Sequence, residues 1–280
     1  MAKSENPLKD PKKRSAATQL VHGGTVRSQH GETSEAMFLN SGFVYPSSEA
    51  AERRFNNTDP GYIYSRFSNP TVEMFQDRMA LLEGGEAARG FATGMAAVTT
   101  TLMSQVRAGD HVVASKALFG GCLFVVQDYL PRYGVTSTLV DGRDPANFEK
   151  AMQKNTTAVF LETPTNPTLD LVDIAAVAKI AHAHRAKLIV DNVFATPILQ
   201  SPLKLGADLV VYSATKHIDG QGRVLGGVTV GSKELITGDL HTFIRQTGPS
   251  MSPFNGWVLL KGLEMLSLRV RNESFAANGE

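Results

Sequence analysis

The chain has 280 residues, of which 28 are basic and 27 acidic, so its formal net charge is +1. This near-neutral balance argues against nucleic acid as a partner, because proteins that track phosphates need a basic surface stripe. No apolar run approaches the roughly 18 residues that cross a bilayer, which excludes a membrane span. The hydrophobic share of 42% is that of a globular protein, and the length allows one large domain, or one domain and part of another.

The cysteine and histidine content gives no sign of a disulfide or a metal site. Cys122 is the sole cysteine, and we expect it to be a small buried or loop residue. The seven histidines include no His-x-x-x-His pair with a carboxylate, so no metal is expected. Residues Met1–Ser15 are basic but lack an apolar core, which excludes a secretory signal and predicts a solvated, mobile arm. We therefore expect a cytoplasmic protein.

The hydrophobic pattern predicts an irregular start followed by alternating helices and strands. Residues 16–70 are rich in Gly, Asn, Ser and Pro, which predicts an extended arm with short turns. Helices are then predicted over 70–83, 94–106, 120–133, 145–154 and 173–184. Strands are predicted over 87–92, 110–115, 135–140, 158–162, 187–191 and 208–212. This alternation predicts an α/β fold around a mainly parallel sheet that helices cover on both faces.

Several polar residues follow the predicted strands directly. Asp191 ends one strand, Lys216 comes just after another, and Asn166 follows a third. Thr93-Gly94-Met95 joins a strand to the start of a helix. Each feature alone has a structural explanation, as a cap, a turn or a solvated side chain. Because open α/β sheets bind ligands at the carboxyl ends of their strands, we expect them to meet in one site.

Together these residues predict a site for pyridoxal 5′-phosphate. That cofactor needs a lysine for a Schiff base and a carboxylate that keeps its pyridine nitrogen protonated. It also needs a phosphate cradle, which a helix N-terminus supplies, and a flat aromatic side chain over its ring. The candidates in that order are Lys216; Asp191; Gly94 and Met95 with the hydroxyls of Ser213 and Thr215; and Phe119.

Four ordered motifs resemble the Cys/Met-metabolism family of pyridoxal phosphate enzymes. They are Tyr62-Ile-Tyr64-Ser-Arg66 with Asn69-Pro70-Thr71, Thr93-Gly94-Met95, Glu162-Thr-Pro-Thr-Asn166-Pro167 and Ser213-Ala-Thr-Lys216. The resemblance extends from about Thr18 to Arg271. It implies the large domain of a fold-type I pyridoxal phosphate transferase.

The resemblance also implies roles for the site residues. Lys216 would hold the cofactor and move protons, while Asp191 would pair with the pyridine nitrogen and Asn166 with the ring 3-oxygen. The phosphate would be held by Gly94, Met95, Ser213 and Thr215. Tyr64 and Arg66 would reach the phosphate of a neighbouring subunit, which implies a homo-oligomer, a dimer at least and a homotetramer by expectation. Phe119 stands where many relatives carry tyrosine, so it can stack but offers no hydroxyl.

The activity that the resemblance implies is γ-replacement on an amino-acid substrate. Phe119-Gly-Gly and His217-Ile-Asp-Gly-Gln-Gly-Arg223 most resemble the O-succinylhomoserine sulfhydrylase branch, in which O-succinylhomoserine and sulfide give homocysteine and succinate in methionine biosynthesis. Cystathionine γ-synthase, O-acetylhomoserine sulfhydrylase and methionine γ-lyase share these motifs and stay open as alternatives. A non-catalytic remnant that serves in cofactor binding or assembly is a further alternative.

The resemblance implies a C-terminal domain whose arginine binds the substrate carboxylate, and we expect most of that domain to be missing here. The expected division is an N-terminal arm over 1–65, a cofactor-binding α/β domain over 66–254, and a linker helix within 255–280. That helix, from about Asn255 to Asn272, carries a broad apolar stripe. The stripe consists of Trp257, Leu259, Leu260, Leu263, Leu266 and Leu268. We expect this stripe to be exposed, which would make the protein poorly soluble. We also expect low turnover, because the substrate carboxylate lacks its arginine.

Overall fold

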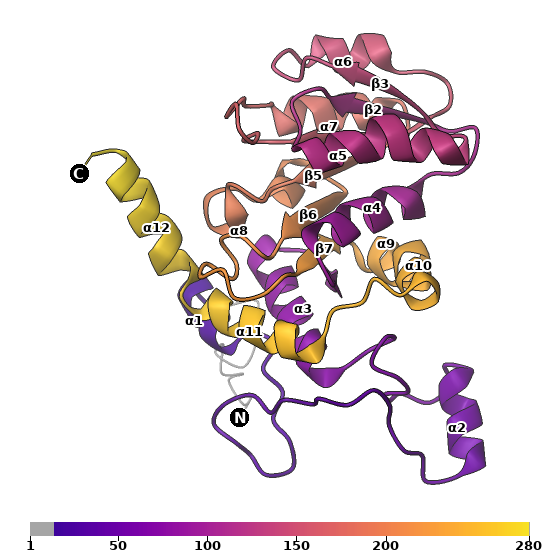
Figure 1. The fold of residues 1–280 in the computed structure, drawn as a ribbon, viewed down its shortest axis with the longest axis vertical. Helices are drawn as coiled ribbons and strands as arrows, with labels where there is room; N and C mark the ends of the chain where they lie inside the picture. Colours follow the sequence, from indigo (N-terminus) through magenta and orange to yellow (C-terminus); the bar gives the residue numbers. More distant parts are fainter. Residues whose placement is uncertain (1–13, 280) are drawn as a thin grey trace, which may run out of the picture.

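A computed structural model describes residues 14–279, and its centre is a seven-stranded sheet in the order β1-β7-β6-β5-β4-β2-β3 (Figure 1). Residues 1–13, which make up most of the expected mobile arm, lie outside the described part. The strands are β1 Ala87–Phe91, β2 His111–Ser115, β3 Thr136–Val140, β4 Thr156–Glu162, β5 Lys187–Asp191, β6 Leu209–Ser213 and β7 Gly227–Gly231. The six predicted strands are confirmed, and β7 is an addition.

The direction of the strands brings the candidate residues to one edge of the sheet. Strands β3, β2, β4, β5 and β6 run parallel to one another. Strand β7 is antiparallel to β6, and β1 is antiparallel to β7, so β1 again runs in the direction of β6. The carboxyl ends of β1, β4, β5 and β6 therefore meet at the same edge, which confirms the mainly parallel sheet.

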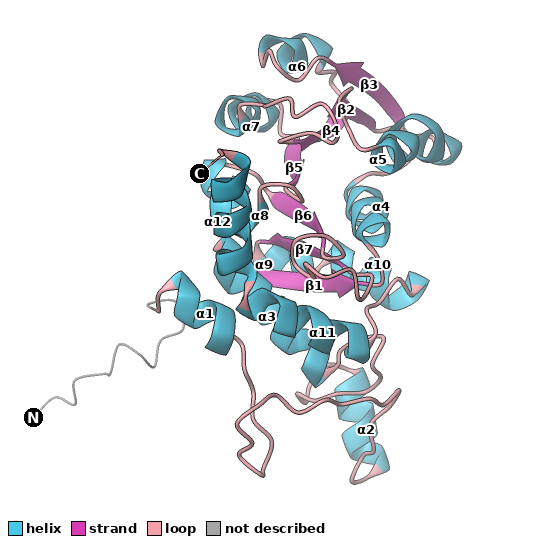
Figure 2. Cartoon of the chain, turned by 60° about the vertical axis from the view of Figure 1, so that its left-hand side comes forward, coloured by secondary structure: helices cyan, strands magenta, loops and turns pink. Residues whose placement is uncertain are grey.

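Helices cover both faces of the sheet (Figure 2). One buried cluster joins it to α3 Pro70–Glu83, α7 Ile174–Ala183 and α11 Pro253–Glu264. The other joins it to α4 Gly94–Gln105, α5 Gly120–Phe124, α9 Lys233–Thr237 and α10 Asp239–Thr247. Successive strand residues alternate between the clusters; Val112 and Ala114 belong to the second and Val113 to the first. Strands buried on both faces explain why they are continuously apolar.

Several predicted elements differ from those observed. The segment 16–70 is not only an extended arm, because it contains α1 Ala16–His22 and α2 Ser48–Phe55, each capped by a serine hydroxyl. Such short helices give too few turns for a periodic signal. The helix predicted over 120–133 changes pitch after α5, to a π-helix over Val125–Tyr129 and a 3-10 helix over Leu130–Tyr133. Helix α6, Ala146–Ala151, is shorter than predicted, and α8 is the short helix Thr196–Leu199.

The predicted C-terminal helix is wrong in two respects. It is two helices, α11 and α12 Leu266–Ala277, which meet at Met265. Its apolar stripe is also largely covered, because Leu259, Leu260, Leu263 and Leu266 are fully buried within the core that includes α3. Of the predicted stripe, Leu268 is exposed. The leucines of α11 and the first leucine of α12 thus find partners within this chain, where we expected them to be exposed.

A buried ionic cluster fastens the N-terminal segment to this core. Arg78 of α3, whose side chain is fully buried, donates to Glu35 at 3.1 Å and to the Gly23 carbonyl at 2.8 Å. Lys261 of α11 makes a second ion pair with Glu35. Burial alone would raise the pKa of Glu35, but the bonds from Lys261 and Arg78 outweigh it and lower that pKa to about 2.

The helices within residues 14–279 include no candidate membrane span, because none combines the length and the apolar character that a bilayer crossing needs.

Candidate active site

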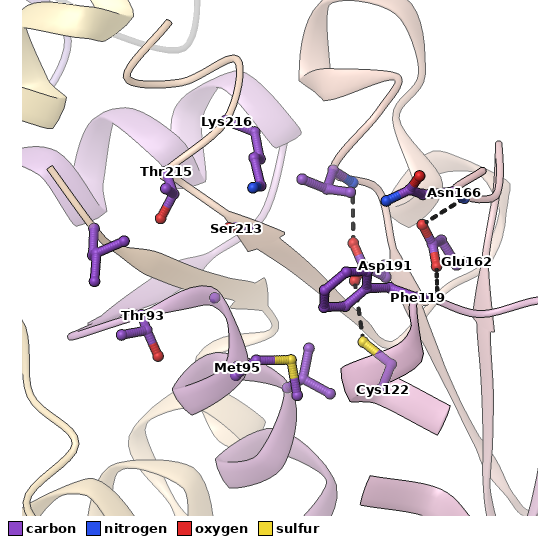
Figure 3. Close-up of a pocket in the computed structure, with 14 residues that line it drawn as sticks. Thr93, Met95, Phe119, Cys122, Glu162, Asn166, Asp191, Ser213, Thr215 and Lys216 are labelled. Atoms are coloured by element: carbon purple, nitrogen blue, oxygen red, sulfur yellow. Dashed lines mark hydrogen bonds between the residues drawn. The ribbon is translucent and has the colours of Figure 1, made fainter. Parts of the chain in front are cut away.

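A cavity of about 250 Å³ lies at the carboxyl edge of the sheet, where the polar strand ends meet (Figure 3). Its walls contain eight of the ten predicted site residues, which come from β5, β6, α4 and the loops after β2, β4 and β6. These are Gly94, Met95, Phe119, Asn166, Asp191, Ser213, Thr215 and Lys216. Residues that we did not predict complete the lining: Thr93, Val98, Cys122, Glu162, Val193 and Leu225.

One end of the cavity is built to receive an anion. The Thr93 side chain caps α4 by accepting from the Ala96 N–H at 2.9 Å. The N–H groups of Gly94 and Met95, in the first turn of the helix, have no intrahelical partner. Free N–H groups and the helix dipole attract negative charge at such a terminus. A Cβ on Gly94 would lie 2.5 Å from Ser213 Cβ and Oγ, so only glycine allows this close approach of helix and strand.

The turn after β6 carries Thr215 and Lys216. The Thr215 hydroxyl donates to the Gly226 carbonyl at 3.2 Å and accepts from the Gly226 N–H at 3.0 Å, which fixes the turn to the next loop. The Lys216 side chain points into the cavity (Figure 3), and within residues 14–279 its Nζ has no hydrogen-bond or ion-pair partner. Arg269 of α12 bonds the His217 carbonyl at 2.8 Å, which holds the turn from behind. The backbone at Lys216 is therefore fixed by the bonded turn, while the amine of its side chain is available to react with a ligand in the cavity.

The other end of the cavity is acidic. Asp191 and Glu162 end the neighbouring strands β5 and β4 and are paired in register. Both are buried, and no described cation forms a salt bridge with either. Burial and the Glu162 charge raise the pKa of Asp191 to about 7, although the Val193 N–H at 3.1 Å opposes that rise. Burial likewise raises the pKa of Glu162.

Glu162 links the two loops that flank the cavity. Its Oε2 accepts from the Phe119 N–H at 2.6 Å, and its Oε1 accepts from the Asn166 N–H at 3.0 Å. Phe119 is 46% exposed, and its ring stands over the cavity in front of Asp191 (Figure 3). A Cβ on Gly121 would lie 2.9 Å from Met95 Sδ and 3.1 Å from Phe119 Cε1, so the ring has close neighbours on that side.

Cys122 is buried, as predicted, but it also touches the acidic end. Its Sγ donates to Asp191 Oδ2 over 3.9 Å. Burial and the nearby carboxylates raise the pKa of this thiol well above its usual range, so it stays a neutral donor. The thiol is thus a weak hydrogen-bond partner of Asp191 and no nucleophile.

Tyr64 and Arg66, the remaining predicted site residues, do not line this cavity. They line a separate hollow with Ser250 and its neighbours. Arg66 donates to the Arg245 carbonyl, and its guanidinium lies 5.4 Å from the Tyr64 ring centroid and 4.9 Å from that of Phe67. Tyr64 is partly exposed there. Within one chain the two residues therefore belong to another surface.

The main residue that sequence reasoning missed is Glu162. A usable signal existed, because Glu162 closes a continuously apolar strand in the same way as Asp191 does. Two strands that neighbour each other in a parallel sheet place such terminal carboxylates side by side. Thr93 was quoted only as part of a motif, and Cys122 offered no signal beyond its uniqueness.

The polarity of the cavity fits pyridoxal phosphate. Backbone N–H groups and a hydroxyl at one end suit a phosphate, and two buried carboxylates at the other end suit a protonated ring nitrogen. Lys216 supplies an amine between them, and Phe119 supplies a flat cover. Among the residues that the structure describes, no group of three or more His, Cys, Asp or Glu side chains is arranged to hold a metal ion.

Comparisons with known proteins agree with this fit. Residues 17–279 match the model of the family "Cys/Met metabolism PLP-dependent enzyme", where PLP is pyridoxal phosphate. The chain is 53% identical to O-succinylhomoserine sulfhydrylase of Mycobacterium tuberculosis over 94% of its length, and 42% identical to L-methionine gamma-lyase of Treponema denticola over 97%. It spans 65% of the first relative's length and 68% of the second's.

A solved structure confirms the expected fold. The chain superposes with a TM-score of 0.86 and 31% identity on a Campylobacter jejuni protein assigned as an O-acetylhomoserine (thiol)-lyase, over 91% of this chain and 72% of that one. That structure contains N′-pyridoxyl-lysine-5′-monophosphate. The fold-type I large domain predicted from the sequence is therefore confirmed.

The raised pKa of Asp191 predicts a stability that depends on pH. Between the ordinary value of 3.8 and the folded value of about 7, the folded state keeps a proton that the unfolded state releases. This contribution to stability is complete below pH 3.8 and is lost as the pH rises through 7. Over that interval the loss is on the order of 4 kcal/mol.

Asp191→Asn removes this loss because the amide carries no charge. In the cofactor-free protein we expect the variant to gain stability relative to the natural chain as the pH rises from 5 to 8, measured by urea unfolding. Asp128→Asn, at an exposed helical position, serves as the control and should show no such trend. A stability difference for Asp191→Asn that is equal at both pH values would contradict the buried, destabilised carboxylate.

Proposed function

Because the chain belongs to the Cys/Met metabolism family of pyridoxal phosphate-dependent enzymes, we propose that it binds this cofactor in the cavity at the sheet edge and catalyses γ-replacement. The proposed reaction converts O-succinylhomoserine and sulfide to homocysteine and succinate. The chain spans less than two thirds of the length of the sulfhydrylase relative, so activity, substrates and partners are all part of the proposal.

The observation that carries the proposal is the opposite polarity of the two ends of the cavity. Anion-binding N–H groups at Gly94 and Met95 face an acidic end formed by Asp191 and Glu162, with the Lys216 amine in between. Two buried carboxylates without a cation are costly, and a bound positive group offsets that cost. A ligand with a phosphate and a basic ring nitrogen satisfies both ends together.

Each residue then has a role that follows from its chemistry. When bound, the cofactor supplies an electron sink for electrons released at the substrate Cα. Asp191 would hold a proton on the ring nitrogen, and Asn166 would offer an amide to the ring edge. The Lys216 amine would hold the cofactor and, once the substrate's amino group has taken its place, would take a proton from Cα and then one from Cβ. The γ-ester would leave as succinate, sulfide would add at Cγ, and the protons would return to Cβ and Cα.

Phe119 takes no part in proton transfer. Its ring can cover a planar ligand but has no acidic hydrogen, and the amine among the described lining residues that can move a proton at the substrate is Lys216. The 53% identity to a sulfhydrylase, against 42% to a methionine γ-lyase, supports replacement over elimination.

The test is a product assay of the purified chain with pyridoxal phosphate. We expect homocysteine and succinate from O-succinylhomoserine and sulfide, with less product from O-acetylhomoserine and little 2-oxobutyrate from methionine alone. Lys216→Ala should lower turnover by roughly 10²–10⁴-fold, the usual contribution of a positioned acid–base group. Lys179→Ala, at an exposed position of α7, is the matched control and should keep full turnover.

The outcomes separate the alternatives. Cystathionine from O-succinylhomoserine and cysteine, without homocysteine from sulfide, would replace sulfhydrylase by cystathionine γ-synthase activity. Rapid 2-oxobutyrate release from methionine would support a γ-lyase. Cofactor binding without any product would support the non-catalytic alternative.

We further propose that the site is completed by a second copy of the chain. Arg66 offers a planar donor fork suited to phosphate, yet it lies on a surface outside its own cavity, beside the partly exposed Tyr64. A symmetric dimer presents the same surface twice and can place each Arg66 at the other cavity. This arrangement supports a homodimer as the minimal unit, or a homotetramer made of two such dimers.

Mixed oligomers test the sharing of the site. We expect Arg66→Ala and Lys216→Ala to be impaired separately and to regain turnover when their subunits are exchanged, because one site in each mixed dimer holds both natural residues. Arg66→Lys should restore only part of the function, since its ammonium cannot form the planar fork. Verified subunit exchange without any recovered turnover would contradict a shared site.

A further inference from the structure

Glu162 belongs to the acidic end of the cavity, but the proposed reaction gives its carboxylate no proton to move and no cofactor atom to hold. Its side chain is fully buried, and no described lysine, arginine or histidine pairs with it. Its raised pKa and its pairing with Asp191 mean that it adds repulsion to the site. A buried carboxylate without a charged partner destabilises the fold, so its presence needs a reason.

The hydrogen bonds of Glu162 supply that reason. Each of its two oxygens accepts one backbone N–H, from Phe119 at 2.6 Å and from Asn166 at 3.0 Å. These two residues follow different strands and are far apart in the sequence. They are also the two cavity residues proposed to touch the face and the edge of the cofactor ring. One rigid carboxylate therefore fixes the spacing between the ring cover and the ring-edge donor (Figure 3).

Within residues 14–279, Glu162 is the acceptor for both of these amides. Phe119 is the N-cap residue of α5 but provides no side-chain cap, and it is 46% exposed. Asn166 lies in the loop after β4, where its N–H has Glu162 as its partner. Since β4 is a central strand paired on both sides, its last residue is a rigid point of attachment for both loops.

We propose that Glu162 is a positioning residue that holds Phe119 and Asn166 at the separation the cofactor ring requires. The proposal rests on the cofactor binding proposed above, but its structural part, the retention of two amides by one carboxylate, exists without cofactor. Glu162 acts through the backbone amides of the two loops. We therefore expect the positions of Phe119 and Asn166 to depend on the length of the side chain at position 162 and on its two acceptor oxygens.

Two substitutions separate length from charge. Glu162→Gln keeps the length but replaces one acceptor by an N–H₂ group, which faces a backbone N–H and cannot accept from it. Glu162→Asp keeps the charge and both acceptors but is one methylene too short to reach both loops. Glu83→Gln is the matched control, because Glu83 is equally buried and its pKa is also raised by burial, yet it lies at the end of α3 outside the cavity wall.

The first measurement is hydrogen exchange resolved to single amides, on the cofactor-free 280-residue chain. In each of the two Glu162 variants, the Phe119 amide, the Asn166 amide or both should exchange roughly ten- to a hundredfold faster, the change expected for a lost bond to a charged acceptor. In Glu83→Gln both amides should keep their natural rates. Unchanged exchange at both amides in the two Glu162 variants would overturn the proposal, whether or not the chain binds cofactor.

The second measurement is the titration of each protein with pyridoxal phosphate, followed by visible circular dichroism. Both Glu162 variants should bind about tenfold more weakly and give an altered dichroic band, while Glu83→Gln matches the natural chain. In a Phe119→Ala background, Glu162→Gln should cost less affinity, since the amide at position 119 remains but no longer positions a ring. If Glu162→Asp binds as the natural chain does and only Glu162→Gln is impaired, charge rather than position is the cause and the proposal is wrong.

The two measurements keep the proposals apart. If the natural chain binds no cofactor, the proposed function fails, while the exchange rates still decide whether Glu162 holds the two loops. If the natural chain binds cofactor and the Glu162 variants match it in exchange, affinity and dichroism, the positioning role fails and the proposed function stands.

Discussion

Two buried carboxylates, Glu162 and Asp191, end neighbouring parallel strands side by side, and no described cation forms a salt bridge with either. Such a pair destabilises the folded chain, because each charge loses its water and repels the other. In the proposed function, a ligand with a protonated ring nitrogen binds beside this pair and reduces the repulsion between the two carboxylates. The relief of that repulsion then contributes to the affinity of the protein for the ligand.

The sheet topology is what makes this arrangement possible. Two reversals of direction, at β7 and at β1, return β1 to the direction of β6, so the start of α4 reaches the same edge as Asp191. The site thus combines a helix N-terminus from one part of the sheet with carboxylates from the other. Arg269 of α12 and Glu162 of β4 hold the loops in between, so the reactive groups rest on rigid elements.

The sequence was sufficient for the parallel core and for most of the cavity wall, because apolar strands followed by polar residues give a direct signal. It was insufficient where an element is short, or where the residues that cover an apolar surface are distant in the sequence. Helices α1 and α2 are too short to show periodicity, and β7 reads as a glycine-flanked segment. The apolar stripe of α11 looked unpartnered because its contacts with α3 depend on tertiary packing. The position of Glu162 at the end of an apolar strand was a usable signal, but its two bonds to backbone amides cannot be read from a sequence.

The central claim is that Lys216 carries pyridoxal phosphate in this cavity, and chemical trapping tests it most directly. The chain is incubated with the cofactor, reduced with borohydride, digested, and searched by mass spectrometry for the modified lysine. We predict one dominant pyridoxyl group, on Lys216, whose formation is suppressed by Asp191→Asn far less than by Lys216→Ala. Modification spread over surface lysines, with Lys216 left free, would contradict the account.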